Sequence, residues 1–417
     1  MQLGIILLVV AISYVGANDV DVKHIQAIFK ELEELNKELT LPQDAGLNIS
    51  QLLDKYGFPL EYHEVETEDG WILTMHRIPY GRNEVPDPSV TKPAIFFAHP
   101  LTGTSMNWAF RAPNVSLALQ LADQGYDIWL GNTRGNKNCR HKTLAPSDKE
   151  YWNFSFHEKG FYDTAAMIDY ILANTKLEKL SYVGHSQGTA QFFTLTSTRP
   201  EYNEKLNLAT LFSPIAFMSH VSKGPIAGLA AKYQKEVEAI IDIVKIYGIL
   251  PAQLDEGLVY NLCASSGILQ EICFTITQLF CGFDDEQLDK DAMLLMYSTG
   301  FGGVGTKEMI HYLQEINSGY FRQYDYGNET NLERYGSIEP PSYDVSQITT
   351  PLAIYYGKAD YLGTVEDIEY LLPQLTNADI MDQYLLEFEH LGFLTARDVH
   401  ELLYDRVLDL INKVHNK

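Results

Sequence analysis

Short apolar segments alternate with helix-like stretches along most of the chain. Tyr62–Thr67 and Trp71–Ile78 alternate between apolar and polar positions around an Asp69-Gly70 turn signal, which predicts a β-hairpin. Later segments are mostly apolar without alternation, as in strands buried on both faces: Ala94–Phe97, Asp127–Leu130, Leu180–Val183, Leu208–Phe212, Leu352–Tyr356 and Tyr384–Phe388. Helix-like stretches separate several of them: Ser116–Gln124, Asp163–Asn174 and Thr189–Thr198. This order predicts an α/β fold with a mostly parallel sheet covered by helices on both faces.

The strand and helix rhythm stops between Ile215 and about Gly305. Tyr233, Val237, Ile240, Ile241, Val244 and Tyr247 form an apolar stripe at helical spacing, and further helical pieces follow. We expect residues 215–305 to be an inserted helical cap over the carboxyl edge of the sheet, with residues 48–214 and 306–417 forming the core. The alternative is an extra layer that has no role at the functional site.

The N-terminus has the pattern of an export signal. A short apolar run from Leu3 to Ile12 ends in the small residues Val15-Gly16-Ala17, so we expect residues 1–17 to be cleaved as a signal peptide. The alternatives are a buried helix or a membrane anchor, although the run is short for a bilayer span. Residues 18–47 are charged and helix-prone, and form either a removable pro-segment or a helix packed on the body. No later segment has 18 uninterrupted apolar residues, so we expect no transmembrane segment.

Composition narrows the classes of partner. Asp and Glu outnumber Lys and Arg by 55 to 31, which gives a formal net charge of −24 and argues against nucleic acid as the partner. The apolar fraction of 46% excludes a disordered chain. The charge disfavours docking on anionic membranes but not on neutral lipid droplets. Four Asn-X-Ser/Thr triplets predict glycosylation in an exported protein, at Asn48, Asn114, Asn153 and Asn328.

The cysteines are too few for a disulfide scaffold. There are four, Cys139, Cys263, Cys273 and Cys281, and the last three lie within 19 residues. One local disulfide is compatible with an oxidising compartment. The chain has no Cys-X-X-Cys zinc spacing and no His-Glu-X-X-His motif, so we expect no metal and no cofactor.

The strongest chemical signal is Gly184–Gly188, with the sequence GHSQG. It follows an apolar strand segment and precedes a helix-like stretch, which is the setting of a nucleophile elbow. Such a turn exposes the serine hydroxyl at the edge of the sheet, near a helix N-terminus. We therefore predict Ser186 as a nucleophile that needs a neighbouring base.

The base and the acid should follow later strands. His390 comes just after the last apolar run, and Asp360 follows the run before it. In this arrangement the acid fixes the tautomer of the histidine and stabilises its cation. Glu366 and Asp367 compete with Asp360 but lie further from the strand end. We predict Asp360 as the acid and His390 as the base.

Two backbone N–H groups are expected to stabilise the oxyanion. One belongs to Gln187, directly after the nucleophile, and the other to Leu101, in the loop after Phe96–Ala98. Pro100 has no N–H to donate. These groups complete a site for acyl transfer through an acyl-enzyme.

With these motifs in this order, the chain resembles the acid lipase family of α/β hydrolases, which includes the gastric and lysosomal lipases. The resemblance runs from about Asn48 to the C-terminus. It is carried by Tyr56–Pro59, Thr67–Leu73, Arg77–Pro79, Gly131–Asn136, Trp152–Phe156, Gly184–Gly188, Cys281–Asp284, Pro340–Val345 and Glu389–Leu391.

The resemblance implies an α/β-hydrolase core with an inserted helical cap and lid. It also implies a secreted or lysosomal glycoprotein that hydrolyses neutral lipid esters, such as triacylglycerols or sterol esters. The family's nucleophile, acid and base fall on Ser186, Asp360 and His390, and its oxyanion donors fall on Leu101 and Gln187. In relatives the first two cysteines of the cap are paired, which would join Cys263 to Cys273, and a Cys273–Cys281 bridge stays open.

The chain departs from the family pattern at three positions near the site: Pro100, Thr364 and Gly392. Relatives usually have glycine at the first and often or usually have aspartate at the other two. None of these changes removes a triad atom. They bear on the shape of the oxyanion hole and on the support of the His390 loop.

Other functions remain open. A non-catalytic lipid-binding or storage protein could use the same scaffold, and a hydrolase of small esters could use the same core. The segment Gly300–Gly305 matches the G-x-G-x-x-G fingerprint of dinucleotide sites, with Asp325 about 20 residues on. No predicted strand leads into these glycines, so we expect no dinucleotide site there.

Overall fold

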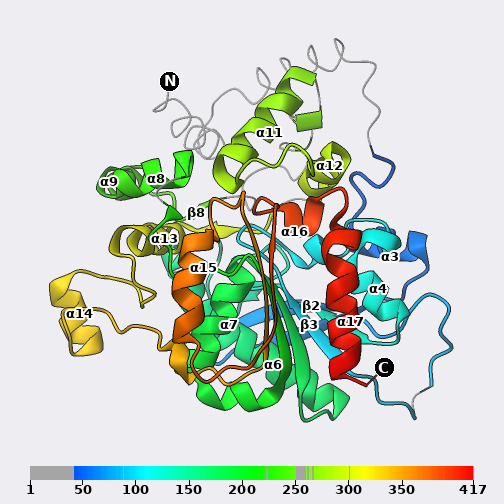
Figure 1. Ribbon diagram of the computed structural model, residues 1–417. Coiled ribbons are helices and arrows are strands. Elements are labelled where there is room, and N and C mark those ends of the chain that lie inside the picture. The colour runs from blue at the N-terminus through cyan, green and yellow to red at the C-terminus, as the bar shows by residue number, and fades with distance from the viewer. Residues whose placement is uncertain are drawn as a thin grey trace.

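In the computed structural model, a central sheet of nine strands carries helices on both faces (Figure 1). The structure describes residues 42–87, 89–221, 224–249, 260, 263–264, 267–299 and 301–416. Along the sheet the strand order is β1-β2-β4-β3-β6-β7-β10-β11, and β5 pairs with β2. Strands β1, β2 and β5 are antiparallel to their neighbours, and the others are parallel. The strands are β1 Glu61–Glu66, β2 Trp71–Ile78, β3 Ala94–Ala98, β4 Asp127–Leu130, β5 Arg140–His141, β6 Leu180–His185, β7 Leu206–Phe212, β10 Leu352–Gly357 and β11 Ile380–Leu386.

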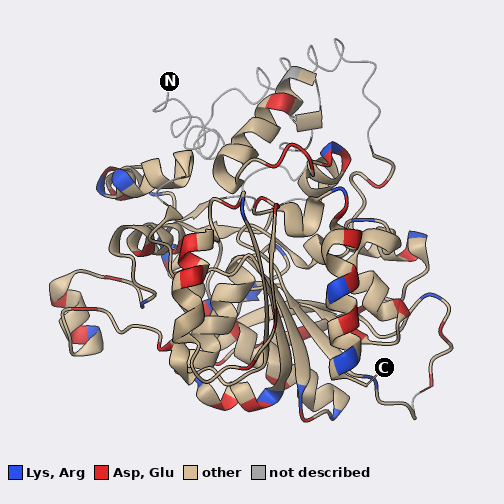
Figure 2. Ribbon diagram, viewed as in Figure 1, with Lys and Arg blue, Asp and Glu red and all other residues tan. Residues whose placement is uncertain are grey.

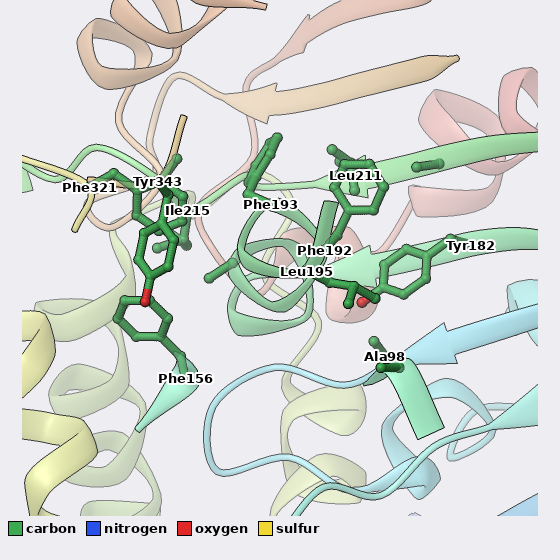
Figure 3. Packing of buried hydrophobic residues seen from close by; sticks show 14 of the residues in the cluster. Ala98, Phe156, Tyr182, Phe192, Phe193, Leu195, Leu211, Ile215, Phe321 and Tyr343 are labelled. Atoms are coloured by element: carbon green, nitrogen blue, oxygen red, sulfur yellow. The ribbon is translucent and has the colours of Figure 1, made fainter. Parts of the chain in front are cut away.

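Alternate residues of each central strand face opposite hydrophobic cores, because successive strand side chains point to opposite faces. Phe96 lies in one core and Phe97 in the other. The first core packs α6 Ala165–Thr175, α7 Gln187–Thr198 and α15 Val365–Leu371 against the sheet, and Figure 3 shows its aromatic centre. The second core packs the helices of the other face: α3 Ile49–Tyr56, α4 Leu117–Asp123 and α17 Asp405–Val414.

The observed strands follow the predicted apolar runs, with one correction. The last strand was expected at Tyr384–Phe388, but β11 spans Ile380–Leu386. It forms the edge of the sheet, so most of its side chains are partly or fully exposed and polar residues lie within it. Phe388 is buried although it lies after the strand, where it packs edge-on against Phe393.

The helices within residues 225–298 lie beyond the carboxyl edge of the sheet (Figure 1). They are α8 Pro225–Lys232, α9 Gln234–Val244, α11 Gly267–Cys281 and α12 Lys290–Ser298. After them come α13 Thr306–Ser318 and α14 Asn328–Tyr335, and α14 lies to the side of the sheet. The two-residue strands β8 Gly248–Ile249 and β9 Val304–Gly305 pair where this region returns to the core. The helices before residue 305 belong to the region that we expect to be a cap, residues 215–305, whereas α13 and α14 lie in the part that we expect to be core.

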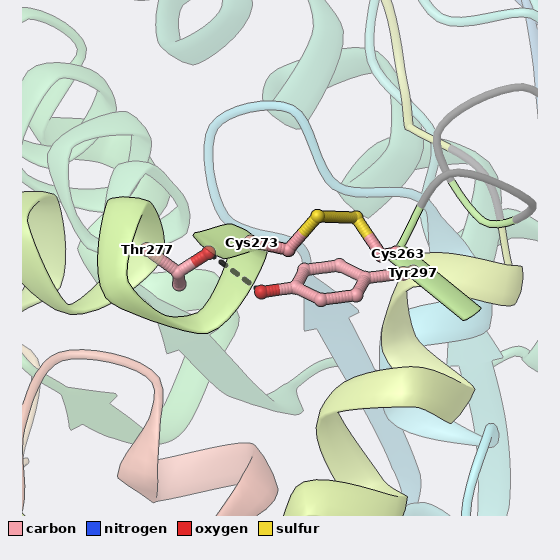
Figure 4. Close-up of a disulfide and its surroundings, with 4 residues drawn as sticks. All are labelled: Cys263, Cys273, Thr277 and Tyr297. Carbon is pink, nitrogen blue, oxygen red and sulfur yellow. Dashed lines mark hydrogen bonds between the residues drawn. A yellow bond between two sulfur atoms is a disulfide. The ribbon is translucent and has the colours of Figure 1, made fainter. Parts of the chain in front are cut away.

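A disulfide joins Cys263 to Cys273 in α11 (Figure 4). This is the pairing that the resemblance implies, and Cys281 stays a buried free thiol at the end of the same helix. Beside the disulfide, the hydroxyls of Thr277 in α11 and Tyr297 in α12 lie 2.6 Å apart. The bridge and this hydrogen bond tie neighbouring helical segments together.

Charged side chains lie mainly on the outer helices and loops, and the central strands are largely free of them (Figure 2). None of the described helices is long and apolar enough to cross a membrane. The described residues also include no group of three or more His, Cys, Asp or Glu placed to hold a metal ion. The expected signal peptide, and residues 18–41 of the expected N-terminal segment, lie outside the described residues.

Candidate active site

Ser186 occupies a strained turn between β6 and α7. Its φ of 54° and ψ of −118° are rare for a residue with a side chain. Gly188 allows this turn to pack on the end of β3, because an added Cβ would lie 2.4 Å from the carbonyl oxygen of Ala98. The local sequence therefore forms the expected elbow, with the serine at the carboxyl end of the strand.

The structure brings together the three side chains predicted to form the triad. The hydroxyl of Ser186 lies 2.7 Å from Nε2 of His390. Nδ1 of His390 lies 3.0 Å from each carboxylate oxygen of Asp360. All three side chains are buried. The arrangement lets the imidazole accept the serine proton while the carboxylate holds the other ring nitrogen.

Further donors hold the Asp360 carboxylate in place. The backbone N–H groups of Leu362 and Gly363 donate to its Oδ1 at 2.8 and 2.9 Å. The hydroxyl of Ser213 donates to Oδ2 and lies 2.7 Å from Nδ1 of His390. Burial raises the pKa of Asp360, but the electrostatic interaction with His390 and these hydrogen bonds outweigh it and lower the pKa below its usual value. The acid therefore stays ionised in mildly acidic solution.

Sequence reasoning missed Ser213, which belongs to no motif. The only signal was its position directly after β7, at the carboxyl edge where the site residues of a parallel sheet collect. It also missed His185, the second residue of the elbow pentapeptide. Nε2 of His185 lies 2.8 Å from the carbonyl oxygen of His390. Burial lowers the pKa of His185 to about 3, so its ring is neutral and can support the His390 loop as a hydrogen-bond donor.

One backbone carbonyl connects the acid loop and the base loop. The carbonyl oxygen of Cys281, at the end of α11, accepts the N–H of Tyr361 at 3.2 Å and the N–H of His390 at 3.1 Å. The helix that carries the disulfide is thereby joined to both loops.

The competing acid and the other histidines have different partners. Asp367 accepts hydrogen bonds from Thr364 and contacts His220, and Thr364 caps the N-terminus of α15. As the N-cap of α15, Thr364 has a structural role at this departure from the family pattern. His311 lies in the core against Phe156, whereas His400 and His415 contact Asp405 and Ser181. The structure brings none of these groups to Ser186.

The loop after β3 lies beside the elbow, because Ala98 pairs with Gly184 across the parallel strands. Among the described residues, the N–H groups of Leu101 and Gln187, the predicted oxyanion donors, donate to no backbone carbonyl. The left-handed backbone of the loop lies at Thr102, with a φ of 62°, so the fixed φ of Pro100 is accommodated.

His99 ties this loop to the segment after β4. Its Nδ1 lies 2.8 Å from the carbonyl oxygen of Pro100, and its Nε2 accepts the N–H of Thr133 at 3.3 Å. Burial lowers the pKa of His99 to about 4, so the neutral ring can donate at one nitrogen and accept at the other.

The glycine-rich stretch packs against the same loop. The N–H of Gly302 donates to the carbonyl oxygen of Thr102 at 2.6 Å. An added Cβ at Gly302 would lie 2.2 Å from the carbonyl oxygen of Gly103. The described part of the stretch ends in β9, which pairs with β8 and has no place in a βαβ unit. The close packing of its backbone against this loop therefore explains why residue 302 is a glycine.

Replacing Gly302 with alanine is expected to displace the loop that carries the Leu101 N–H. We expect kcat to fall roughly 10- to 100-fold, because a lost oxyanion donor costs about 10²–10³ in rate and the displacement is partial. Ester hydrolysis at saturating substrate measures the effect. Gly267→Ala is the control, since its added methyl meets no atom within 4 Å. Equal losses in both variants would contradict the role assigned to Gly302.

Glu389 supports the His390 loop, near the departure at Gly392. The Glu389 carboxylate accepts the N–H of Leu391 at 2.8 Å. Burial, with a smaller contribution from the charges of Asp360 and Asp284, raises the pKa of Glu389 to about 8. The carboxyl group is therefore protonated in the folded protein at pH values where it is ionised in the unfolded chain.

This shift predicts a stability that depends on pH. Because folding raises the pKa of Glu389, its protonated carboxyl group contributes to the free energy of unfolding. This contribution is complete below pH 4.5, the pKa in the unfolded chain, and is lost as the pH rises through about 8. The free energy of unfolding of the wild type should therefore fall between pH 5 and pH 8. In Glu389→Gln, which has no carboxyl group at this position, we expect this fall to be about 1–2 kcal/mol smaller. Urea unfolding at both pH values measures this. Glu387→Gln, on an exposed neighbour, should behave as the wild type, and identical pH dependence in all three proteins would exclude the effect.

All four asparagines of the Asn-X-Ser/Thr triplets are exposed. Asn48 caps the N-terminus of α3, and Asn153 lies at the end of a short turn before α5 Phe156–Glu158. Their glycosylation stays a prediction.

Comparison with known proteins places this geometry in a family. Residues 49–112 match the description "Partial alpha/beta-hydrolase lipase region", and residues 93–234 match "alpha/beta hydrolase fold". A crystal structure of a protein from Acinetobacter baumannii has the same fold, with a TM-score of 0.50 at 16% identity over 88% of this chain and 95% of that chain.

Curated relatives cover most of the sequence. Lipase 3 of Drosophila melanogaster is 37% identical over 84% of this chain and 89% of its own. Gastric triacylglycerol lipase of Rattus norvegicus is 34% identical over 88% of this chain and 92% of its own. Lysosomal acid lipase/cholesteryl ester hydrolase of Homo sapiens is 34% identical over 89% of this chain and 92% of its own. The chain belongs to the gastric and lysosomal acid lipase family of α/β hydrolases and is a carboxylic ester hydrolase.

Proposed function

We propose that this chain hydrolyses neutral lipid esters, triacylglycerols or sterol esters, through an acyl-enzyme on Ser186. His390 takes the proton of the Ser186 hydroxyl as its oxygen attacks the ester carbonyl carbon. The N–H groups of Leu101 and Gln187 stabilise the resulting oxyanion. His390 then gives the proton to the departing alcohol, and water releases the fatty acid by the same route in reverse.

The observation that carries the proposal is the continuous hydrogen-bonded path from Ser186 through His390 to Asp360. The two contacts measure 2.7 and 3.0 Å, within the range for transfer between a nucleophile and its base. Such a path gives a weakly nucleophilic hydroxyl its base, and the lowered pKa of Asp360 keeps the orienting carboxylate charged.

We propose that residues 215–305 form a cap whose outer helices meet the lipid. Along α9, Ile243 is 81% exposed, and Tyr233 and Ile240 are also exposed. Val237 and Ile241 of the same stripe pack on the core. The helix thus has apolar side chains on both sides, which suits an element that moves at a lipid–water interface. An overall charge of −24 favours neutral lipid over anionic membranes.

Secretion is the proposed location, with the lysosome as the alternative. The apolar N-terminal run, the exposed asparagines and the Cys263–Cys273 disulfide all suit an exported protein. The printed names of the relatives include both a gastric and a lysosomal lipase.

A substrate panel tests the proposal. Emulsified long-chain triacylglycerol, a cholesteryl ester and a short-chain ester are given to the wild type and to Ser186→Ala. We expect the wild type to hydrolyse a long-chain ester and the variant to hydrolyse none. Activity that falls steeply as the acyl chain lengthens would favour a small-ester hydrolase, and equal turnover by both proteins would exclude the serine mechanism.

A further inference from the structure

A buried ion pair lies directly beneath the nucleophile elbow. Lys159, in the π-helical turn η4 Lys159–Thr164, contacts the carboxylate of Glu308 in α13 at 2.8 and 2.9 Å. Their side chains are 2% and 0% exposed. Burying two charges costs free energy even when they pair, so a pair in this position requires an explanation other than simple stability.

The pair closes on the side chain of Gln187. Lys159 donates to the amide oxygen of Gln187 at 3.1 Å, and the amide nitrogen donates to Glu308 at 2.8 Å. The hydroxyl of Tyr312 accepts a second hydrogen bond from the same nitrogen at 3.1 Å. The Gln187 side chain is therefore held at three points by groups from two other elements.

Gln187 is the first residue of α7 and follows the strained Ser186. Its backbone N–H is the proposed oxyanion donor. The N–H and the side chain of Gln187 both belong to the first residue of α7, so a shift of this end of the helix would displace them together. Fixing the side chain therefore restricts the position of the N–H beside the nucleophile.

We infer that Lys159 and Glu308 are positioning residues that hold Gln187 so that its N–H stays directed at the oxyanion. This inference rests on the proposed oxyanion role of Gln187. Neither residue touches the reacting atoms. Because donors that are already oriented cost no reorganisation in the transition state, the pair acts on kcat and leaves ester binding unchanged.

The pair also connects the elbow to the end of the expected cap. Glu308 lies in the first turn of α13, directly after β9 and the glycine-rich stretch that packs on the loop of Leu101. The two predicted oxyanion donors are thus supported from one short region, residues 302–312.

Gln187→Ala is the first test, because it removes the held side chain but leaves the backbone N–H and the Lys159–Glu308 pair. We expect kcat to fall about tenfold with KM unchanged, since small misplacement of a catalytic group can cost up to about 10² in rate. Turnover is expressed per active site, counted by a fluorophosphonate label. An unchanged kcat per labelled site would overturn the inference.

The pair itself is tested by Lys159→Met, Glu308→Gln and the double variant. Each single change leaves one buried charge without its partner, whereas the double variant is neutral and its glutamine can still accept from Gln187. We expect kcat to fall about tenfold or more in each single variant and to recover to within about threefold in the double variant. A double variant that folds but stays as slow as the worse single variant would overturn the inference.

Arg77→Met is the matched control. It breaks the partly buried pair with Asp127 at the amino end of β4, away from the elbow. We expect Arg77→Met to lower the denaturant concentration at the unfolding midpoint while kcat per labelled site stays unchanged. If Arg77→Met lost as much kcat as Lys159→Met, the effect at Lys159 would be explained by general destabilisation. The same label separates failure of this inference from failure of the proposed function. If the proposed serine mechanism is wrong, Ser186 will not be labelled even in the wild type.

Discussion

Replacing His390 with alanine is expected to lower kcat by roughly 10⁴- to 10⁶-fold, as for the loss of a base or nucleophile in other serine hydrolases. Nε2 of His390 lies 2.7 Å from the Ser186 hydroxyl, so its removal leaves the nucleophile without this base. Turnover of a soluble ester, per mole of folded protein, measures the loss.

His415→Ala is the control for that experiment. His415 follows α17 and contacts Ser181 near the amino end of β6, whereas Ser186 follows the carboxyl end of the same strand. We expect its kcat to match that of the wild type. A His390→Ala protein that keeps kcat within tenfold of the wild type would require a different base.

Replacing Asp360 with asparagine is expected to lower kcat by about 10³- to 10⁴-fold. The amide keeps the size of the side chain but no longer selects the reactive tautomer of His390 or stabilises its cation. Because Ser213 also lies within hydrogen-bonding distance of His390 Nδ1, we expect the loss to be smaller than for His390→Ala.

Asp367→Asn separates the two candidate acids. Asp367 is as buried as Asp360, but its carboxylate accepts a hydrogen bond from Thr364, the N-cap of α15, and contacts His220. We expect this variant to unfold more easily while keeping most of its kcat. A larger loss of kcat from Asp367→Asn than from Asp360→Asn would reverse the assignment of the acid.

The central sheet could be predicted because its strands are buried on both faces. The runs that became β3, β4, β6, β7 and β10 are apolar over nearly their whole length. β11 was misplaced because it is an edge strand, where exposed polar positions such as Asp382 are tolerated. The apolar signal in Tyr384–Phe388 came partly from Phe388, which is buried after the strand has ended.

The candidate site could be predicted where a motif or a strand end marked it. The elbow pentapeptide indicated Ser186, and the ends of the last two strands indicated Asp360 and His390, which the structure brings together. Ser213, Lys159 and Glu308 carry no such mark, because their positions follow from packing between segments far apart in the sequence. Lys159 and Glu308, for example, are 149 residues apart.

The three departures from the family pattern, at Pro100, Thr364 and Gly392, are also explained by their local surroundings in the fold. Pro100 fits because the left-handed position of its loop is Thr102, and Thr364 caps α15. Gly392 lies against Phe388, where an added Cβ would come 2.9 Å from the Phe388 Cβ, and the carboxylate of Glu389 accepts the N–H of Leu391 nearby. None of these adjustments could be inferred from residue type alone.

The most direct test of the account is covalent labelling of the wild type and of His390→Ala with a long-chain alkyl fluorophosphonate, followed by peptide mass mapping. We predict one adduct on Ser186 in the wild type, complete loss of ester hydrolysis with it, and labelling at least a hundredfold slower in His390→Ala, in keeping with the roughly 10²–10⁴-fold contribution of general-base catalysis. An adduct on another residue, or hydrolysis that continues when Ser186 is fully labelled, would contradict the account.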